Sequence, residues 1–348
     1  MMSLDEVSIL LSRFSQCTLM VVGDLMIDEY LWGHIERISP EAPVPVLTLA
    51  RRDHTLGGAG NVAKNLRSLG AGVVALGIVG TDEAGACIFE ELDNLGVDRE
   101  GVIEEPDRPS TRKSRLMSLE HGQQVFRYDQ ETPTPISPEI EDRLLRQLHR
   151  KMNGVMGVIC SDYLKGVLTK RVLQTSIRCA RDHGLPVIIG PKDSDVDKYR
   201  GATALIPNLR ELEQLAGMKV KGAGDLSQAA QLLAHQAENE SLLVTRGPAG
   251  MSLFEWDQCG MRQIDIPAVA RSVYDVTGAG DTVTSVFTLA IACGATHEYA
   301  ARLSNLAAGL VVQKRGTASL TPDELLEAVE WQSTKEAALM GCPNTSTP

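Results

Sequence analysis

Cys17-Thr-Leu-Met-Val-Val-Gly-Asp24 is an apolar run that ends in a glycine and an aspartate. Such a run is typical of a strand that is buried on both faces of a parallel sheet, with a functional loop at its carboxyl end. The pattern recurs along the chain, at residues 73–80, 157–162, 186–190, 204–208 and 241–247. This recurrence predicts a sheet built from strands of this kind.

Stretches with helical character lie between these runs, at residues 60–69, 83–95, 138–152, 170–183, 209–216, 226–238 and 280–293. Strands that alternate with helices predict an α/β domain, in which helices cover both faces of a mostly parallel central sheet. Ligands of such folds bind outside the carboxyl ends of the strands. The polar residues that follow each apolar run are therefore candidate site residues.

Two segments, residues 29–54 and 111–129, carry shorter alternating patterns such as Val44-Pro-Val-Leu-Thr-Leu-Ala50. These patterns suit a small antiparallel sheet that is exposed on one face. We predict that both segments form a β-sheet lid inserted into a main domain. The main domain would comprise residues 1–28, 55–110 and 130–332, and residues 333–348 would form a disordered tail.

The chain of 348 residues carries a formal net charge of -11. An acidic chain is poorly suited to bind a nucleic-acid backbone or an anionic membrane, so we predict neither partner. The N-terminus lacks an apolar run of signal-peptide length, and the longest apolar stretch, residues 283–295, is interrupted by polar residues. The seven cysteines are scattered and include no Cys-x-x-Cys pair, which predicts reduced thiols and a cytoplasmic protein.

Gly278-Ala-Gly-Asp281 is followed by an apolar, helix-like run. A turn of small residues that opens a helix leaves several backbone N–H groups free, and with the helix dipole these groups bind anions. A phosphoryl group that becomes more anionic during transfer suits such a turn, and a carboxylate in the first turn can accept the proton of an attacking hydroxyl. The alternative is a glycine turn in which Asp281 is a plain N-cap. We interpret Asp281 as a catalytic base and Gly278, Ala279 and Gly280 as the anion-binding turn.

Asp275-Val-Thr-Gly-Ala-Gly-Asp-Thr282 closely resembles the C-terminal signature of the ribokinase-like (PfkB) carbohydrate kinases, and Leu56-Gly-Gly-Ala-Gly-Asn-Val-Ala63 resembles their N-terminal di-glycine motif. Arg37-Ile-Ser-Pro-Glu-Ala-Pro-Val-Pro-Val46 is similar to the heptose 7-phosphate kinase branch, as are residues 21–28, 161–166 and 199–202. The resemblance covers about residues 17–330. It implies a ribokinase-like three-layer α/β fold with a β-sheet lid.

For the nucleotide and metal, the resemblance implies a further set of residues. Asn208-Leu-Arg-Glu211 resembles the family's N-x-x-E motif, which organises Mg²⁺ and the nucleotide phosphates, although a helix capping box explains the same pattern. Thr245-Arg-Gly247 matches the nucleotide-contacting T-x-G, for which a strand-end turn is the alternative. Asn305 lies where the family packs small residues near the adenine, and close helix packing explains it equally well.

The candidate substrate residues lie at strand ends, on the next helix and on the lid. Gly57 and Gly58 would form a flexible joint at the substrate. In the family an aspartate at the position of Asp24 accepts sugar hydroxyls. The other candidates are Asn61, Asn65, Lys113, Arg115, Arg127, Asp162 and Lys165. Each also has a purely structural explanation, such as a buried polar ladder, a solvated lid face or a loop ion pair.

The reaction that the resemblance implies moves the γ-phosphate of ATP onto D-glycero-β-D-manno-heptose 7-phosphate, giving the 1,7-bisphosphate for ADP-heptose and lipopolysaccharide core synthesis. It implies ATP and Mg²⁺ as cofactors, leaves a monovalent cation open, and suggests a homodimer formed through the lid.

One residue departs from the branch, because Gly190-Pro-Lys192 stands where Asp-Pro-Lys is usual. A kinase for another sugar, or a weakened homologue that only binds sugar or nucleotide, are the alternatives. A dinucleotide-dependent oxidoreductase is disfavoured because no G-x-G-x-x-G follows the first strand.

Overall fold

The computed structural model describes residues 3–257, 260–270 and 272–340. These residues form a large sheet with the strand order β13-β12-β11-β10-β9-β8-β1-β4-β5 and a smaller one with the order β3-β2-β6-β7. The strands of the larger sheet are β1 (Thr18–Gly23), β4 (Gly72–Val79), β5 (Asp98–Glu104), β8 (Gly157–Ser161), β9 (Val187–Gly190), β10 (Ala204–Leu205), β11 (Ser241–Thr245), β12 (Met251–Asp257) and β13 (Gly260–Ile266).

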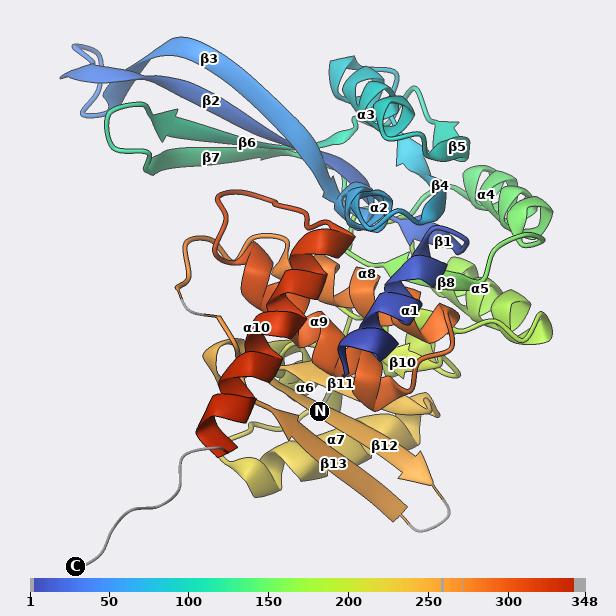
Figure 1. Ribbon diagram of the computed structural model, residues 1–348. Helices are drawn as coiled ribbons and strands as arrows, with labels where there is room; N and C mark the ends of the chain where they lie inside the picture. The colour runs from blue at the N-terminus through green and yellow to red at the C-terminus, as the bar shows by residue number, and fades with distance from the viewer. Residues whose placement is uncertain (1–2, 258–259, 271, 341–348) are drawn as a thin grey trace, which may run out of the picture.

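The larger sheet is parallel from β5 through β11, and β12 and β13 add an antiparallel edge. Strands such as β1 and β8 are buried almost throughout, because helices cover both of their faces. One apolar core lies between the sheet and α1 (Leu4–Phe14), α2 (Ala59–Ser68), α3 (Glu83–Asn94), α8 (Ala279–Ala292), α9 (His297–Val311) and α10 (Pro322–Met340). The core on the other face involves α4 (Pro138–Lys151), α5 (Lys170–Asp182), α6 (Leu209–Ala216) and α7 (Ala223–Ala237). The predicted α/β architecture with helices on both faces is confirmed (Figure 1).

Helix α8, which carries the predicted base, is deeply enclosed on its face of the sheet. Its side chains are buried on all sides, from Thr282 through Ala290. It packs against α9 and α2 as well as against strands of the sheet. A helix that is buried on all sides is stable only inside a core, where each of its large apolar side chains contributes about 1.5–3 kcal/mol on full burial. The hydroxyls of Thr284, Ser285 and Thr288 are satisfied by carbonyls one turn earlier in the chain. The position of Asp281 is therefore set by the core.

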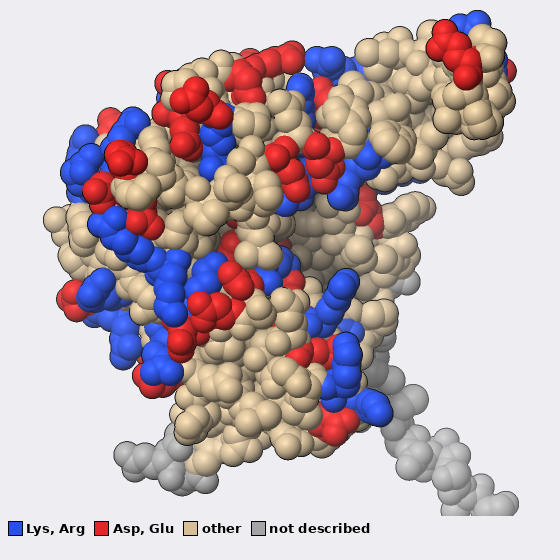
Figure 2. Space-filling view, turned by 180° about the vertical axis from the view of Figure 1, so that it is seen from behind, with Lys and Arg blue, Asp and Glu red and all other residues tan. Residues whose placement is uncertain are grey.

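The smaller sheet extends from one side of the main body (Figure 1). It contains β2 (Leu25–Ile38), β3 (Pro45–Gly58), β6 (Thr111–Ser118) and β7 (Gln124–Gln130). Strand β2 pairs antiparallel with β3 and parallel with β6, and β7 pairs antiparallel with β6. This is the sheet in which the predicted lid segments lie, and it includes four residues before residue 29 and four after residue 54. Because β2 begins two residues after β1 ends, the lid starts at the carboxyl edge of the large sheet. Figure 2 shows the surface hollowed between this projection and the main body.

Other expectations concern the termini, the thiols and the membrane. Helix α10 continues to Met340, so residues 333–340 of the predicted disordered tail are helical, and residues 341–348 lie outside the described residues. Among the described cysteines, free thiols are found at Cys17, Cys87, Cys160, Cys179 and Cys293, whereas Cys259 and Cys342 lie outside the described part. None of the helices in the described ranges has the length and apolar character needed to cross a membrane.

Candidate active site

Asp281 stands in the first turn of α8, with its side chain 8% exposed. Its Oδ2 accepts a hydrogen bond from Asn61 Nδ2 at 2.7 Å, and its Oδ1 accepts one from the hydroxyl of Tyr163 at 2.6 Å. Burial raises the pKa of this carboxyl above its ordinary value, against the opposing effect of the two hydrogen bonds. A buried carboxylate with a raised pKa is a suitable proton acceptor for a hydroxyl.

The turn before Asp281 requires a glycine at its first position. Gly278 is the N-cap of α8 and has a φ of +79°, and a Cβ there would lie 2.8 Å from Asn61 Nδ2. The N–H of Ala279 donates to Val276 and that of Thr282 to Gly278. The intervening N–H groups of Gly280 and Asp281 belong to the first turn, where a helix supplies no acceptor, and so can receive an anion.

Asn61 and Asn65 lie on α2 and connect it to α8. Besides the bond from Asn61 to Asp281, Asn65 Oδ1 accepts a hydrogen bond from the hydroxyl of Thr282 at 2.9 Å, and Asn65 Nδ2 donates to the carbonyl of Asn61 at 2.8 Å. Each asparagine is 1% exposed. The pair is thus a buried polar ladder that fixes the start of α8, and of the two only Asn61 contacts Asp281.

Asp24 follows β1 and is 1% exposed. Its Oδ2 accepts the backbone N–H groups of Tyr163 at 2.8 Å and Lys165 at 3.1 Å, and its Oδ1 accepts that of Val167 at 3.2 Å. Burial raises the pKa of this carboxyl, and the three amides act in the opposite direction. Asp24 therefore holds the loop that follows β8.

Tyr163 belongs to this loop and was not among the residues predicted for the site. Its hydroxyl contacts Asp281, and the ammonium groups of Lys113 and Lys192 lie over its ring, 5.6 and 5.8 Å from the centroid. Through Tyr163, Asp24 is joined to Asp281 although they are distant in the sequence. The signal that could have identified this residue is an aromatic ring with a polar tip at the end of a buried strand.

Asp28 also reaches the site from strand β2. Its Oδ1 accepts from Arg115 on the neighbouring lid strand at 2.6 Å, and it is 5% exposed. A Cβ on Gly57 would lie 2.6 Å from Asp28 Oδ2, so the first glycine of the pair makes room for this carboxylate. Gly57 and Gly58 end β3 in register with β2, and Gly58, with a φ of +55°, is the N-cap of α2.

The predicted lid and loop cations have different surroundings. Lys113 has no carboxylate within ion-pairing distance among the described residues, and burial lowers its pKa. Arg127 is about half exposed on β7 and pairs with Asp129 at 3.0 Å. Lys165 pairs with Glu131 at 2.8 Å. Of these three cations, Lys113 lies against Tyr163 and has its charge available for an anion.

Asp162 directly follows β8 and precedes Tyr163 in this loop, but its side chain contacts other groups. Its Oδ2 accepts from the Tyr199 hydroxyl at 2.9 Å, and its Oδ1 accepts from the N–H of Leu164 at 3.0 Å. The neighbouring Gly190 has open space where a Cβ would be. Asp193, three residues after Gly190, pairs with Lys198 at 2.8 Å.

Asn208 and Glu211 form a capping box at the start of α6. The Glu211 carboxylate also contacts Lys192 Nζ. Asn208 pairs with Thr245 in a parallel bridge, which brings the end of β11 and the adjacent Gly247 to the same edge of the sheet. Asn305 lies apart on α9 and donates to the carbonyl of Pro267 at 2.9 Å.

The residues present fit a magnesium ion that is held by few protein ligands, with phosphate oxygens and water completing its coordination. Among the described residues, His, Cys, Asp and Glu form no group of three that could enclose a metal ion. Mg²⁺ in phosphoryl-transfer sites is commonly held by one or two carboxylates, with phosphate oxygens and water completing its shell. Glu211 supplies one such carboxylate at the edge where the other nucleotide candidates gather.

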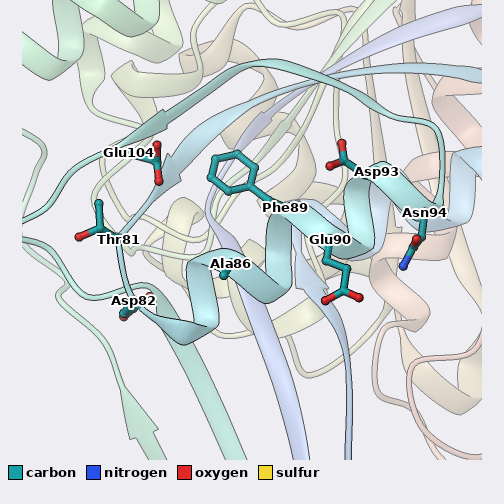
Figure 3. A pocket seen from close by; sticks show the side chains of 9 residues that line it. Thr81, Asp82, Ala86, Phe89, Glu90, Asp93, Asn94 and Glu104 are labelled. Carbon is teal, nitrogen blue, oxygen red and sulfur yellow. The ribbon is translucent and has the colours of Figure 1, made fainter.

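A separate pocket of about 460 Å³ lies along α3, lined by residues that include Asp82, Phe89, Glu90, Asp93 and Glu104 (Figure 3). It contains none of the predicted site residues. Asp82 is committed to the N–H groups of Gly85 and Ser110, at 2.9 and 3.0 Å, and Asp93 pairs with Arg99 at 2.6 Å. This pocket therefore forms no part of the arrangement around Asp281.

A family model described as pfkB family carbohydrate kinase matches residues 17–324. The chain belongs to this family. The family and the fold are thus those that the sequence predicted.

Similar proteins extend this result. A curated relative from Geotalea uraniireducens, "Bifunctional protein HldE", is 44% identical over 94% of this chain and 66% of its own length. One of the same name from Geobacter sulfurreducens is 42% identical over 90% of this chain and 63% of its own. The chain thus spans slightly less than two thirds of these relatives.

Solved structures show the ribokinase-like fold. Phosphofructokinase-2 from Escherichia coli, in complex with potassium, gives a TM-score of 0.77 at 19% identity over 91% of this chain and 99% of its own. Arabidopsis thaliana ribokinase, complexed with ribose and ATP, gives 0.70 at 22% identity over 90% of this chain and 99% of its own.

Proposed function

We propose that this chain transfers the γ-phosphoryl group of MgATP to the anomeric hydroxyl of D-glycero-β-D-manno-heptose 7-phosphate. The hydroxyl oxygen forms a bond to the γ-phosphorus, the bond to the bridging oxygen of ADP breaks, and the hydroxyl proton passes to Asp281. The products are the 1,7-bisphosphate and ADP, and the place of this reaction is ADP-heptose supply for lipopolysaccharide core synthesis. The observation that carries the proposal is the buried carboxylate of Asp281 beside the N–H groups of the Gly278–Asp281 turn.

The choice of a phosphorylated sugar rests on the cations near Tyr163. Lys113 has no carboxylate partner among the described residues, so a substrate phosphate can neutralise it. The heptose itself rests on the resemblance of residues 37–46 and on the curated relatives that carry the name HldE. Asp28, which lies beside Gly57 and pairs with the candidate Arg115, is added to the candidate substrate residues.

The nucleotide would occupy the edge of the large sheet that carries Asn208, Thr245 and Gly247. Asn305, which binds the carbonyl of Pro267, would lie on the adenine side. Mg²⁺ bound by Glu211 would neutralise charge on the transferring phosphate. A monovalent cation enters the proposal through phosphofructokinase-2, whose structure was solved in complex with potassium. Comparing rates in potassium and tetramethylammonium salts tests that requirement. Because ATP is the proposed phosphoryl donor, we also propose that the protein acts in the cytoplasm.

The deciding experiment measures ADP release with heptose 7-phosphate and with a panel of other sugars and sugar phosphates, for the wild type and for Asp281→Asn. We expect turnover with heptose 7-phosphate and a fall in kcat of about 10²–10⁴-fold in the variant, with little change in ATP affinity. Turnover only with another sugar would leave a different carbohydrate kinase. Binding without turnover would leave the weakened homologue that Gly190 suggests, and an unchanged rate in Asp281→Asn would remove Asp281 as the base.

A further inference from the structure

The two carboxylate oxygens of Asp281 accept hydrogen bonds from two different parts of the fold. Asn61 on α2 donates to Oδ2, and Tyr163 in the loop after β8 donates to Oδ1. A carboxylate oxygen has two acceptor positions, so each oxygen keeps one for a substrate hydroxyl. With both donors in place, the plane of the carboxylate is fixed before any substrate arrives.

Tyr163 is itself held at three points. Its backbone N–H donates to Asp24, which also binds Lys165 and Val167 and so fixes the course of the loop. Its ring lies against the ammonium groups of Lys113 and Lys192. Lys113 belongs to lid strand β6, whereas Lys192 follows β9 and contacts Glu211. The ring thus lies where the lid, the candidate metal edge and the base meet.

We propose that Tyr163 is the positioning residue of the catalytic base, and that its phenol O–H orients the Asp281 carboxylate, favours its ionised form and links it to the lid. The proposal rests on the proposed function, because it takes Asp281 to be the base. It adds a residue to the machinery that neither the glycine motifs nor the N-x-x-E motif contains. It also gives Asp24 a reason to be buried, since Asp24 positions the loop from which Tyr163 acts.

A structural role for Tyr163 would have a different signature. A ring that only fills space would affect stability, and through it the amount of active enzyme, equally at every pH. A donor to the ionised carboxylate acts on one protonation state, because its loss leaves desolvation less opposed and the pKa of Asp281 rises further. The acid limb of the pH profile of kcat/KM must then move to higher pH.

The test compares the wild type with Tyr163→Phe, which keeps the ring and its contacts with both lysines. We expect kcat to fall about tenfold, KM for ATP to change little, and the acid limb to move up by about one to two pH units, the loss expected of a hydrogen bond to a charged group. Tyr299→Phe is the matched control, because the Tyr299 hydroxyl is buried without a hydrogen-bond partner among the described residues. It should leave both kcat and the acid limb at their wild-type values. Thermal melting checks that each variant is folded.

A direct titration makes the result independent of turnover. The infrared carboxyl band that disappears in Asp281→Asn should titrate at higher pH in Tyr163→Phe than in the wild type. An unchanged titration and an unchanged acid limb would overturn the proposal, as would a loss of rate that is uniform across pH. If the wild type shows no turnover with any sugar, the proposed function fails, and this titration still decides whether Tyr163 favours the ionised carboxylate.

Discussion

Lys192 Nζ contacts the carboxylate of Glu211, so the candidate metal ligand is ion-paired with a lysine. Lys192 also lies over Tyr163, whose hydroxyl binds Asp281. The arrival of MgATP would therefore exchange one set of pairings for another, with the metal taking the carboxylate and a phosphate taking the ammonium. This exchange needs no movement of the helix that carries Glu211, because its capping box already fixes α6.

Replacing Glu211 with glutamine tests its role in metal binding. We expect the Mg²⁺ concentration that gives half-maximal rate to rise about tenfold or more, because a neutral amide is a weak ligand for a hard cation. The measurement is a Mg²⁺ titration at fixed ATP. Glu213→Gln is the matched control, since Glu213 lies on the same helix but pairs with Lys219 at 2.8 Å. An equal Mg²⁺ requirement in both variants would show that Glu211 serves only as the cap of α6.

Asp24→Asn separates a structural from a substrate-binding role. An amide cannot accept all three N–H groups of the loop, so we expect a loss of about 1–3 kcal/mol in the free energy of unfolding, together with a lower kcat because Tyr163 loses its anchor. Urea denaturation and steady-state kinetics measure the two effects. Asp225→Asn, which also removes a carboxylate that accepts a backbone N–H, is the surface control. A raised KM for the sugar at unchanged stability would instead place Asp24 on the substrate.

Local patterns in the sequence were sufficient for most of the fold. Helix α6 spans the residues predicted for it, and the apolar runs beginning with Cys17 became buried parallel strands, because these features depend on periodicity within a few turns or on burial of one segment. Strands β12 and β13 were not identified, since β13 is a largely unburied edge strand and the apolar run of β12 is short and interrupted by Ser252 and Glu255.

The site shows where local reasoning stops. The motifs marked Asp281 and Glu211 because each stands at a helix start with a recognisable pattern. The contact between Tyr163 and Asp281 joins residues 118 positions apart, and no spacing rule reports it. Asp24 looked available at a strand end, but the path of the loop after β8 brings three amides to it. Such contacts follow from tertiary packing, which a single sequence does not display.

Gly278→Ala should disturb the base through sterics alone. The substitution places a Cβ 2.8 Å from Asn61 Nδ2 at a φ of +79°, so we expect about 1–3 kcal/mol of destabilisation and a lower kcat as Asn61 moves from Asp281. Chemical denaturation measures the first effect. Gly280→Ala is the control for stability, because a Cβ there meets nothing within 4 Å and alanine is favoured inside a helix. Equal stability of the two variants would mean that the turn relaxes without cost.

The lid offers a surface for self-association. Phe126 is 59% exposed, and Leu49, Val125 and Tyr128 add exposed apolar area on the same sheet. Lone exposed apolar residues are ordinary, but a cluster on a projecting sheet is typical of an interface. We propose that two chains pair through this lid, so a charge at the most exposed of these side chains, Phe126 on edge strand β7, should dissociate them. Sedimentation velocity should show a dimer for the wild type and a monomer for Phe126→Glu. Both proteins are measured at a concentration at least tenfold above the wild-type dissociation constant. Ile9→Glu, which alters an exposed residue of α1, should remain dimeric. A monomeric wild type, or a dimeric Phe126→Glu, would exclude the lid as the interface.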